Sequence, residues 1–512
     1  MPIDSKNPEY DKFAFQWQKC RDAVAGEDAV KAGNQIYLPQ LEGQTDYDYQ
    51  AYKNRALYFS ASGRTVKGLA GAILRKHPVI QFPNEDLLLT IGPAGESLEH
   101  MIKTIVEEVI TTGRVGVLVD SAAGPDNQNV EPYLAIYYPE NIINWDERTV
   151  AGRRQLVMVV LQESGPRRDD DGNDPFAWNS RVDTYRVMEL IGWDTPNPFL
   201  RVSLYERVQS SDENPTDQTK ENEDEDGYKG FELIDQVEPK LPGGIPIDYI
   251  PFVIINPSVA GSECEPPPII DLVNVNLSHY RNSADLEHGL HFTALPQPWV
   301  AGVESPNIRL RIGSQTAWVI ADPQARAGYL EFSGNGLRAI QAAMDEKKKM
   351  MAILGSRLLE DQKADAEAAA TVKLRHSGDE SVLANIVHAI DEGLALSLMW
   401  FAQWAMLDGE ITVELNDDFN PLGIDYPTLI GLMSAVQAGQ LSWDTWFYNV
   451  KRGELVPDGR TAEQEKALIE AGYPVLPTPD ISEDTAVGGG KVKSGGAARM
   501  SGANDTGDVG PS

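Results

Sequence analysis

Apolar residues recur at helical spacing between residues 98 and 110, at Leu98, Met101, Ile102, Ile105, Val106, Val109 and Ile110. This i, i+3, i+4, i+7 pattern predicts an amphipathic helix, and Gly113 is a typical residue to end it. Residues 47–74 also show helical spacings. Basic side chains near the end of that segment (Arg64, Lys67, Arg75 and Lys76) favour the negative pole of a helix. The first hundred residues are therefore predicted to be mostly helical.

After Gly113 the period changes to that of β-strands. Short β-rich runs predict strands at 115–119, 133–138, 156–161, 182–190, 200–208, 231–234 and 251–255. They indicate a mostly antiparallel α+β domain over roughly 114–256. Two polar inserts interrupt it. The aspartates of the insert at 167–174 leave calcium binding open beside a solvated hairpin loop, although EF-hand spacing is absent. The insert at 210–227 has too few apolar residues to pack and is predicted to be disordered.

Long helices are predicted in the C-terminal half, at 266–291, 337–360 and 380–407, with shorter ones at 427–438, 443–452 and 461–471. The triple proline at 266–268 is compatible with a first helical turn. A strand-turn unit at 299–332 separates the first two helices, and the Gly-rich segment after residue 477 is predicted to be disordered. The apolar run 394–407 is shorter than the roughly 18 residues of a membrane span, so we interpret it as a buried or subunit-facing helix.

Charge and cysteine content narrow the classes of function. With 44 basic and 77 acidic residues in 512, the formal net charge is −33, which disfavours a sequence-reading DNA-binding domain. Cys20 and Cys264 are the only cysteines, which excludes a disulfide framework and a structural zinc cluster. The N-terminus has no apolar signal-peptide core, and reducing cytosol is the expected compartment.

Catalytic motifs are missing from the sequence. It contains no P-loop, no His-Glu-x-x-His helix and no Gly-x-Ser-x-Gly elbow. His288 and His291 share one helical face and leave a metal site open beside the interpretation as surface or interface histidines. We therefore predict no enzyme, no cofactor and no metal. An acidic hydrolase with an unrecognised site remains the alternative from another class, although no set of residues supports it.

The order of the elements resembles that of tailed-bacteriophage portal proteins, a family formerly catalogued as a domain of unknown function. The strings that carry the resemblance lie between about 50 and 470, at 52–78, 113–120 (GRVGVLVD), 139–145 (PENIINW), 267–291, 313–314, 328–336, 350–360 (MMAILGSRLLE) and 368–371. In this comparison residues 52–78 are similar to the N-terminal helix of the family. Residues 267–291 and 350–360 are similar to its two stem helices.

The resemblance implies an α+β fold with a β-rich wing, two long stem helices flanking a small α/β clip, and a helical C-terminal crown region. The implied divisions are 1–256 for the N-terminal helices and wing, 257–295 for the first stem helix, 296–336 for the clip, 337–360 for the second stem helix, 361–379 for the tunnel-loop region, 380–475 for the C-terminal wing and crown helices, and 476–512 for a disordered tail. The acidic insert and the Gly-rich tail depart from a minimal portal.

The implied function is a homo-oligomeric ring, usually a dodecamer, at one capsid vertex of the virion. Double-stranded DNA passes through its channel during packaging and ejection. The implied partners are terminase, the major capsid protein and head-completion or adaptor proteins, and assembly takes place in the host cytoplasm. The alternative is another virion connector or a tail-tube protein.

An acidic channel keeps DNA mobile, because like charges repel within a screening length of about 8–10 Å. Sparse basic rings then centre the duplex. Lys347, Lys348 and Lys349 are the first candidates, although they point about 100° apart on a helix, and Lys363 is a second. A solvated face or an intersubunit salt bridge is the alternative for the triplet. We expect substitution of all three by glutamate to leave the ring intact and to lower DNA retention. Arg309 and Arg311 are candidates for contact with terminase or with a neighbouring subunit, or for simple exposure.

Overall fold

The computed structural model describes residues 2–121, 131–150, 152–165, 182–207, 230–293, 297–301, 324, 326–330, 335–357, 382–417, 419, 426–453, 455–457 and 460–471. The predictions for the inserts at 167–174 and 210–227, for the tunnel-loop region and for the tail after residue 477 lie outside these residues. The described part contains runs of helices and runs of antiparallel strands, so the predicted α+β class is confirmed in this general form.

The N-terminal region is helical, as predicted. Its elements are α1 (Pro8–Ala25), α2 (Glu27–Ala32), η1 (Asn34–Ile36), α3 (Asp46–Arg55), α4 (Ala61–Ile73), η2 (Glu85–Leu89) and α5 (Leu98–Thr112). The single helix expected over 52–78 is wrong, because the chain leaves the helical conformation between Arg55 and Ala61. Arg64 consequently lies in the first turns of α4 and not at its C-terminal pole. The prediction for α5 is confirmed: Gly113 has φ +75° and donates its N–H to the Val109 carbonyl.

All strand pairs among the described residues are antiparallel. A three-stranded sheet has the order β11–β2–β3, from β2 (Val115–Ser121), β3 (Pro132–Tyr137) and β11 (Phe252–Ile255). A five-stranded meander contains β4 (Ile142–Val150), β5 (Arg153–Gly165), β6 (Val182–Ile191), β7 (Phe199–Arg207) and β8 (Phe231–Val237), and the 3-10 turn η3 (Pro139–Asn141) precedes it. Two further pairs are β1 (Val79–Gln81) with β14 (Thr412–Glu414) and β9 (Lys240–Leu241) with β10 (Ile245–Pro246).

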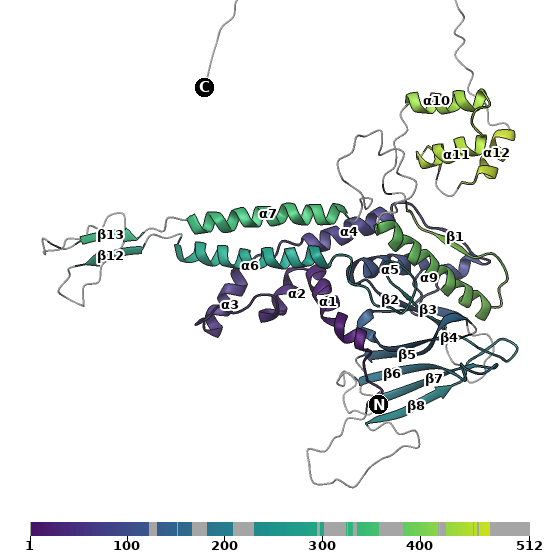
Figure 1. The fold of residues 1–512 in the computed structure, drawn as a ribbon, viewed down its shortest axis with the longest axis horizontal. Coiled ribbons are helices and arrows are strands. Elements are labelled where there is room, and N and C mark those ends of the chain that lie inside the picture. The colour runs from purple at the N-terminus through teal and green to yellow at the C-terminus, as the bar shows by residue number, and fades with distance from the viewer. Residues whose placement is uncertain are drawn as a thin grey trace, which may run out of the picture.

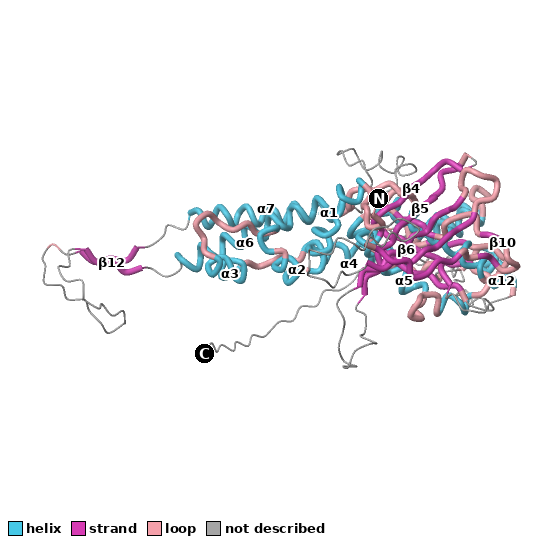
Figure 2. Tube along the Cα trace, turned by 90° about the horizontal axis from the view of Figure 1, so that it is seen from below, coloured by secondary structure: helices cyan, strands magenta, loops and turns pink. Residues whose placement is uncertain are grey.

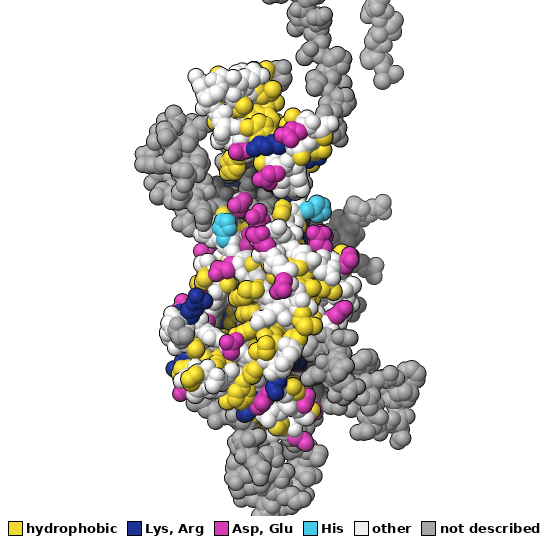
Figure 3. Space-filling model, turned by 90° about the vertical axis from the view of Figure 1, so that its right-hand side faces the viewer, with side chains coloured by type: hydrophobic (Ala, Val, Ile, Leu, Met, Phe, Trp, Pro, Cys, Tyr) yellow, Lys and Arg dark blue, Asp and Glu magenta, His cyan; other side chains and the backbone are white. Residues whose placement is uncertain are grey.

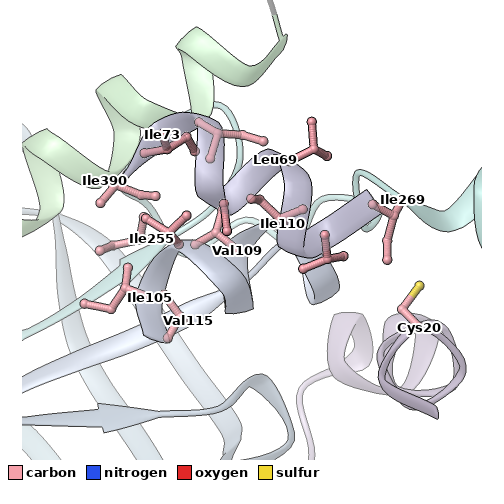
Figure 4. Packing of buried hydrophobic residues seen from close by; sticks show 14 of the residues in the cluster. Cys20, Leu69, Ile73, Ile105, Val109, Ile110, Val115, Ile255, Ile269 and Ile390 are labelled. Carbon is pink, nitrogen blue, oxygen red and sulfur yellow. The ribbon is translucent and has the colours of Figure 1, made fainter. Parts of the chain in front are cut away.

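The main hydrophobic core lies where α4, α5 and α9 (Val382–Trp404) meet the three-stranded sheet (Figure 4). Ile105 and Val109 of α5 face Ile255 of β11 and Ile390 of α9 there. Among the described residues α9 alone is long and apolar enough to span a membrane, and 56% of its apolar window is buried against the rest of the chain. This burial supports the interpretation of the apolar run as a packed helix.

Two long helices project from this body side by side (Figures 1 and 2). They are α6 (Ile270–Thr293) and α7 (Asn335–Arg357), and they run antiparallel. The strands β12 (Gln297–Ala301) and β13 (Arg326–Leu330) pair at their far end. We call this α6–β12–β13–α7 unit the arm. The triple proline precedes α6 and does not fill its first turn, because the helix begins at Ile270, whose N–H donates to the Pro267 carbonyl at 3.0 Å.

A separate group of short helices follows the body. It contains α10 (Tyr426–Gln437), α11 (Trp443–Arg452) and α12 (Ala462–Glu470) and lies apart from the arm (Figure 1). The predicted capping box of α12 is confirmed, since Thr461 and Gln464 each bond the backbone N–H of the other.

Candidate functional site

The N-terminal helices and the segment between α3 and α4 hold α6 from Asn276 to Asp285. Its buried face includes Asn276, His279, Tyr280 and Ser283. The polar contacts are Tyr52 OH to Asp285 Oδ1 (2.6 Å), the Leu57 N–H to Ser283 Oγ (3.1 Å), the Asn276 amide to Tyr58 OH, and Arg281 Nε to the Tyr37 carbonyl (2.9 Å). These hydrogen bonds join α6 to elements far from it in the sequence. They therefore fix the direction in which the arm leaves the body.

Close contacts also set the distance between α6 and α7. A Cβ on Gly289 would lie 2.5 Å from Leu337 Cδ2, so the helices approach each other there because glycine has no side chain. Near the body, Leu272 of α6 and Met351 of α7 are buried together with Ala61 of α4. The arm is thus a packed helical hairpin along its length.

The three predicted lysines point in three directions, as the helical period requires. Lys347 is half-buried and its Nζ donates to the Ser278 carbonyl of α6 at 3.3 Å. Lys348 is exposed, lies 3.5 Å from Asp345 and has its Nζ 5.9 Å from the ring centre of Phe59. Lys349 is exposed and has no ion-pair partner within the described ranges. Lys347 therefore contributes to the packing of α7 against α6. Lys349 is exposed and unpaired among the residues that the structure describes, so it is the lysine of the three that is free to bind an anionic ligand.

His279 lies buried beside these lysines, with its ring 5.8 Å from that of Phe59. Neither ring nitrogen has a hydrogen-bond partner in the described part of the chain. Burial lowers the pKa of His279, and the charges of Lys348 and Lys347 lower it further. These effects favour the neutral form of the imidazole at neutral pH.

The histidine pair near the end of α6 is used in packing. His288 lies between two aromatic rings, 5.2 Å from that of Tyr52 and 4.7 Å from that of Phe292. Burial lowers the pKa of His288 as well, followed by the charge of Arg55. No group of three or more His, Cys, Asp or Glu residues suited to a metal ion occurs among the residues described.

The arm exposes large apolar side chains. Near the tip, the exposed fractions are 41% for Leu290 and 57% for Phe292 on α6, and near the body they are 44% for Met350 and 52% for Ile353 on α7. Burying such a side chain is worth about 1.5–3 kcal/mol. In the single chain these side chains remain exposed to water, so the free energy of burying them is not realised.

The other predicted site residues, Arg309, Arg311 and Lys363, lie outside the described residues. Sequence reasoning missed Arg64 and Lys67, which it assigned to a helix pole. Both are exposed on α4 next to the end of α7, where Gly355 contacts Thr65. Their i, i+3 spacing is a signal that could have placed them on one face.

Residues 268–405, which include α6, the tip of the arm, α7 and α9, match a family model described as "Domain of unknown function (DUF4055)". This match confirms the predicted resemblance. It covers about a quarter of the chain. No curated protein matches the sequence.

Some of the solved structures similar to the chain are parts of gene transfer agent particles. One is the neck of an empty particle computed with C6 symmetry, at 13% identity, 78% of this chain, 91% of that chain and a TM-score of 0.37. Another is the virion of the native particle, at 12% identity, 81% and 96% coverage and a TM-score of 0.34. A third is the neck of the native particle computed with C12 symmetry, at 12% identity, 77% and 89% coverage and a TM-score of 0.33.

Proposed function

We propose that the chain is a portal protein whose copies close into a ring at one capsid vertex and form a channel for double-stranded DNA. The observation that carries the proposal is the arm, a helix–hairpin–helix unit that projects from an α+β body. The family match spans it. In a portal the arm corresponds to the stem helices and clip, and the antiparallel sheets correspond to the wing.

Ring formation would cover the apolar residues that the arm exposes. Leu290 and Phe292 lie beyond the part of α6 that the N-terminal helices cover. A neighbouring copy on each side would bury them, whereas a monomer keeps them in water. Apolar area of this kind is the usual driving force for obligate association.

The charge of the chain fits a conduit. At −33 per copy the ring would be strongly acidic, so duplex DNA would be repelled from most of its surface and would remain mobile. Figure 3 shows carboxylates scattered over one face of the molecule with few basic side chains among them. Lys349 would supply a sparse basic ring.

The proposal includes no catalysis by the chain itself. Terminase would supply the energy for packaging and would dock at the tip of the arm, where β12 and β13 pair. Head-completion proteins would replace it there, and the major capsid protein would surround the body.

Imaging of the purified full-length protein tests the ring. Electron microscopy should show closed rings with a central hole. Leu290→Asn should reduce the fraction of rings, because it removes an apolar contact between copies. Ile234→Asn is the matched control, since Ile234 is 50% exposed on β8, in the sheet and away from the arm. Solitary molecules or open filaments of the wild-type protein would contradict the proposal.

The DNA role of Lys349 needs a separate measurement. Lys349→Glu should leave rings intact and lower the yield or length of packaged DNA, because each subunit then presents an additional negative charge to the duplex. Lys103→Glu, at an exposed position of α5, makes the same charge change away from α7. Equal packaging by both variants would remove Lys349 from the channel.

A further inference from the structure

Two basic side chains, Arg64 of α4 and Lys348 of α7, flank the ring of Phe59, which lies just before α4. Arg64 Cζ lies 5.6 Å and Lys348 Nζ 5.9 Å from the centre of the Phe59 ring. Lys67 is one turn further along α4. We call Arg64, Lys67 and Lys348, together with Phe59, the α4–α7 basic surface. Because Phe59 is 38% exposed, the ring packs against the two cations without burying them.

The chain as a whole carries excess acid. Carboxylates neutralise some exposed arginines, for example Arg148 with Asp146 and Arg154 with Glu263, each at 2.8 Å. Arg64 and Lys67 have no carboxylate partner in the described segments. Nearby acids on α7 are Asp345, which is largely exposed and lies 3.5 Å from Lys348, and the exposed Glu346. The surface therefore keeps a net positive charge.

His279 packs against the same aromatic ring, with the two ring centres 5.8 Å apart. Burial lowers the pKa of His279, the charges of Lys348 and Lys347 lower it further, and the charge of Asp345 acts in the opposite direction.

The face of α4 that carries the cations is short of apolar side chains. Its exposed residues are Arg64, Lys67, Gly68 and Gly71. A Cβ on either glycine would meet no atom within 4 Å, so the helix backbone is open beside the cations. Interfaces between protein copies have an apolar centre with charged residues depleted. An open, positively charged helix face instead suits a bulky polyanion.

We infer that the α4–α7 basic surface binds the phosphate backbone of duplex DNA, with Arg64 and Lys67 as contact residues. The choice of duplex DNA as ligand rests on the proposed function. Contacts of this kind read no sequence, because every duplex presents the same phosphates. Binding weakens as salt rises, since each neutralised phosphate releases counterions.

Binding of a fluorescently labelled duplex of random sequence to the full-length protein, followed across a range of salt concentrations, tests the inference. The variant is Arg64→Gln with Lys67→Gln. Its affinity should fall, and the slope of log K against log salt should decrease in magnitude by about 1–2, because about 0.9 is lost for each phosphate contact. Arg64→Lys with Lys67→Arg keeps both charges and should keep both values. Circular dichroism should show the same fold for each variant.

The matched control is Lys103→Gln with Arg153→Gln, which removes two positive charges from exposed positions on α5 and β5. The inference is overturned if this control weakens binding as much as the α4 variant does. Lack of duplex binding by the wild-type protein overturns it as well. So does a loss of assembly in the α4 variant with unchanged affinity for DNA, because the partner is then an acidic surface of another copy.

Ring formation and DNA binding, measured on the same protein samples, distinguish a failure of this inference from a failure of the proposed function. If rings form and DNA binding is independent of Arg64 and Lys67, the inference fails and the proposed function stands. If the protein stays monomeric and binding depends on both residues, the inference stands and the ring fails.

Discussion

The side chain of Arg21 links three elements, because it lies on α1 and forms ion pairs with a carboxylate of α5 and with one of η3. Its substitution therefore tests how much a partly buried ion pair contributes to stability. Its Nη2 and Nη1 bond the two carboxylate oxygens of Glu108 on α5 at 2.6 and 3.1 Å. Its Nη2 and Nε bond Glu140 of η3 at 2.8 and 2.9 Å. Arg21→Met would leave two carboxylates facing each other without a cation. We expect the free energy of unfolding to fall.

The size of the effect follows from burial. The side chain of Glu108 is 7% exposed, whereas Arg21 and Glu140 are 33% and 28% exposed. Removing one partner of a fully buried ion pair costs about 3–5 kcal/mol. Because two of the three groups here are partly solvated, we expect about 2–4 kcal/mol at neutral pH. Adding Glu108→Gln to Arg21→Met should recover much of that loss, since the uncompensated buried charge is then absent.

The loss should also depend on pH. Burial raises the pKa of Glu108 even in the wild-type protein, and the hydrogen bonds from Arg21 act in the opposite direction. Without Arg21 this pKa rises further above the value of about 4.3 in the unfolded chain. The folded state then binds more protons than the unfolded state, so stability falls as pH rises through that window. Arg21→Met should therefore be closer to wild type in mild acid than at neutral pH.

Urea unfolding of the full-length protein at several pH values measures both effects. Arg154→Met is the matched control, because Arg154 and Glu263 form an ion pair at 2.8 Å with both side chains more than 70% exposed. It should change stability little. The reasoning is refuted if the two substitutions destabilise equally, or if the loss in Arg21→Met is the same at every pH.

Three further predictions concern single positions. Gly393→Ala should destabilise the core by about 1–3 kcal/mol in thermal unfolding, because its Cβ would lie 2.5 Å from Ile255 Cγ1. An unchanged melting temperature would show that α9 can shift. Burial raises the pKa of Asp391 to about 7, opposed by the hydrogen bond from the Leu415 N–H. Its contribution to stability should fall as pH rises from about 4 to 7, and Asp391→Asn should flatten that part of the pH profile. Thr461→Ala should weaken α12 by about 1 kcal/mol, seen as faster amide exchange in that helix alone.

Local sequence signals predicted the bounds of a helix correctly where a characteristic residue, such as a glycine, marks the end of the helix. The apolar period over residues 98–110 and Gly113 defined α5 to within two residues. The break between α3 and α4 has no such signal, since residues 56–60 contain neither glycine nor proline. Their conformation comes from α6, because the Leu57 N–H bonds Ser283 and the Tyr58 ring packs on Tyr280. Tertiary contacts here override a continuous helical pattern.

The candidate site was predictable only as far as local sequence patterns determine it. The helical period showed that Lys347, Lys348 and Lys349 cannot share one face. It could not show which of them faces α6, because that depends on the register of α7 against Ser278. The link between Arg64 and Lys348 is a contact across 284 residues of sequence, made through Phe59. No local pattern contains that information.

The positions of the lysines change how a DNA role must be tested. Glutamate at all three positions would place a carboxylate against the Ser278 carbonyl and remove the cation from Phe59. The expectation that the ring survives this triple substitution is therefore revised, since repulsion at Ser278 would separate α6 from α7. Loss of packaged DNA in that protein could follow from a damaged arm alone. Lys347→Met, which keeps the aliphatic stem and omits the charge, measures the packing role. Packaging that fails with Lys349→Glu and persists with Lys347→Met would assign the effect to charge offered to DNA.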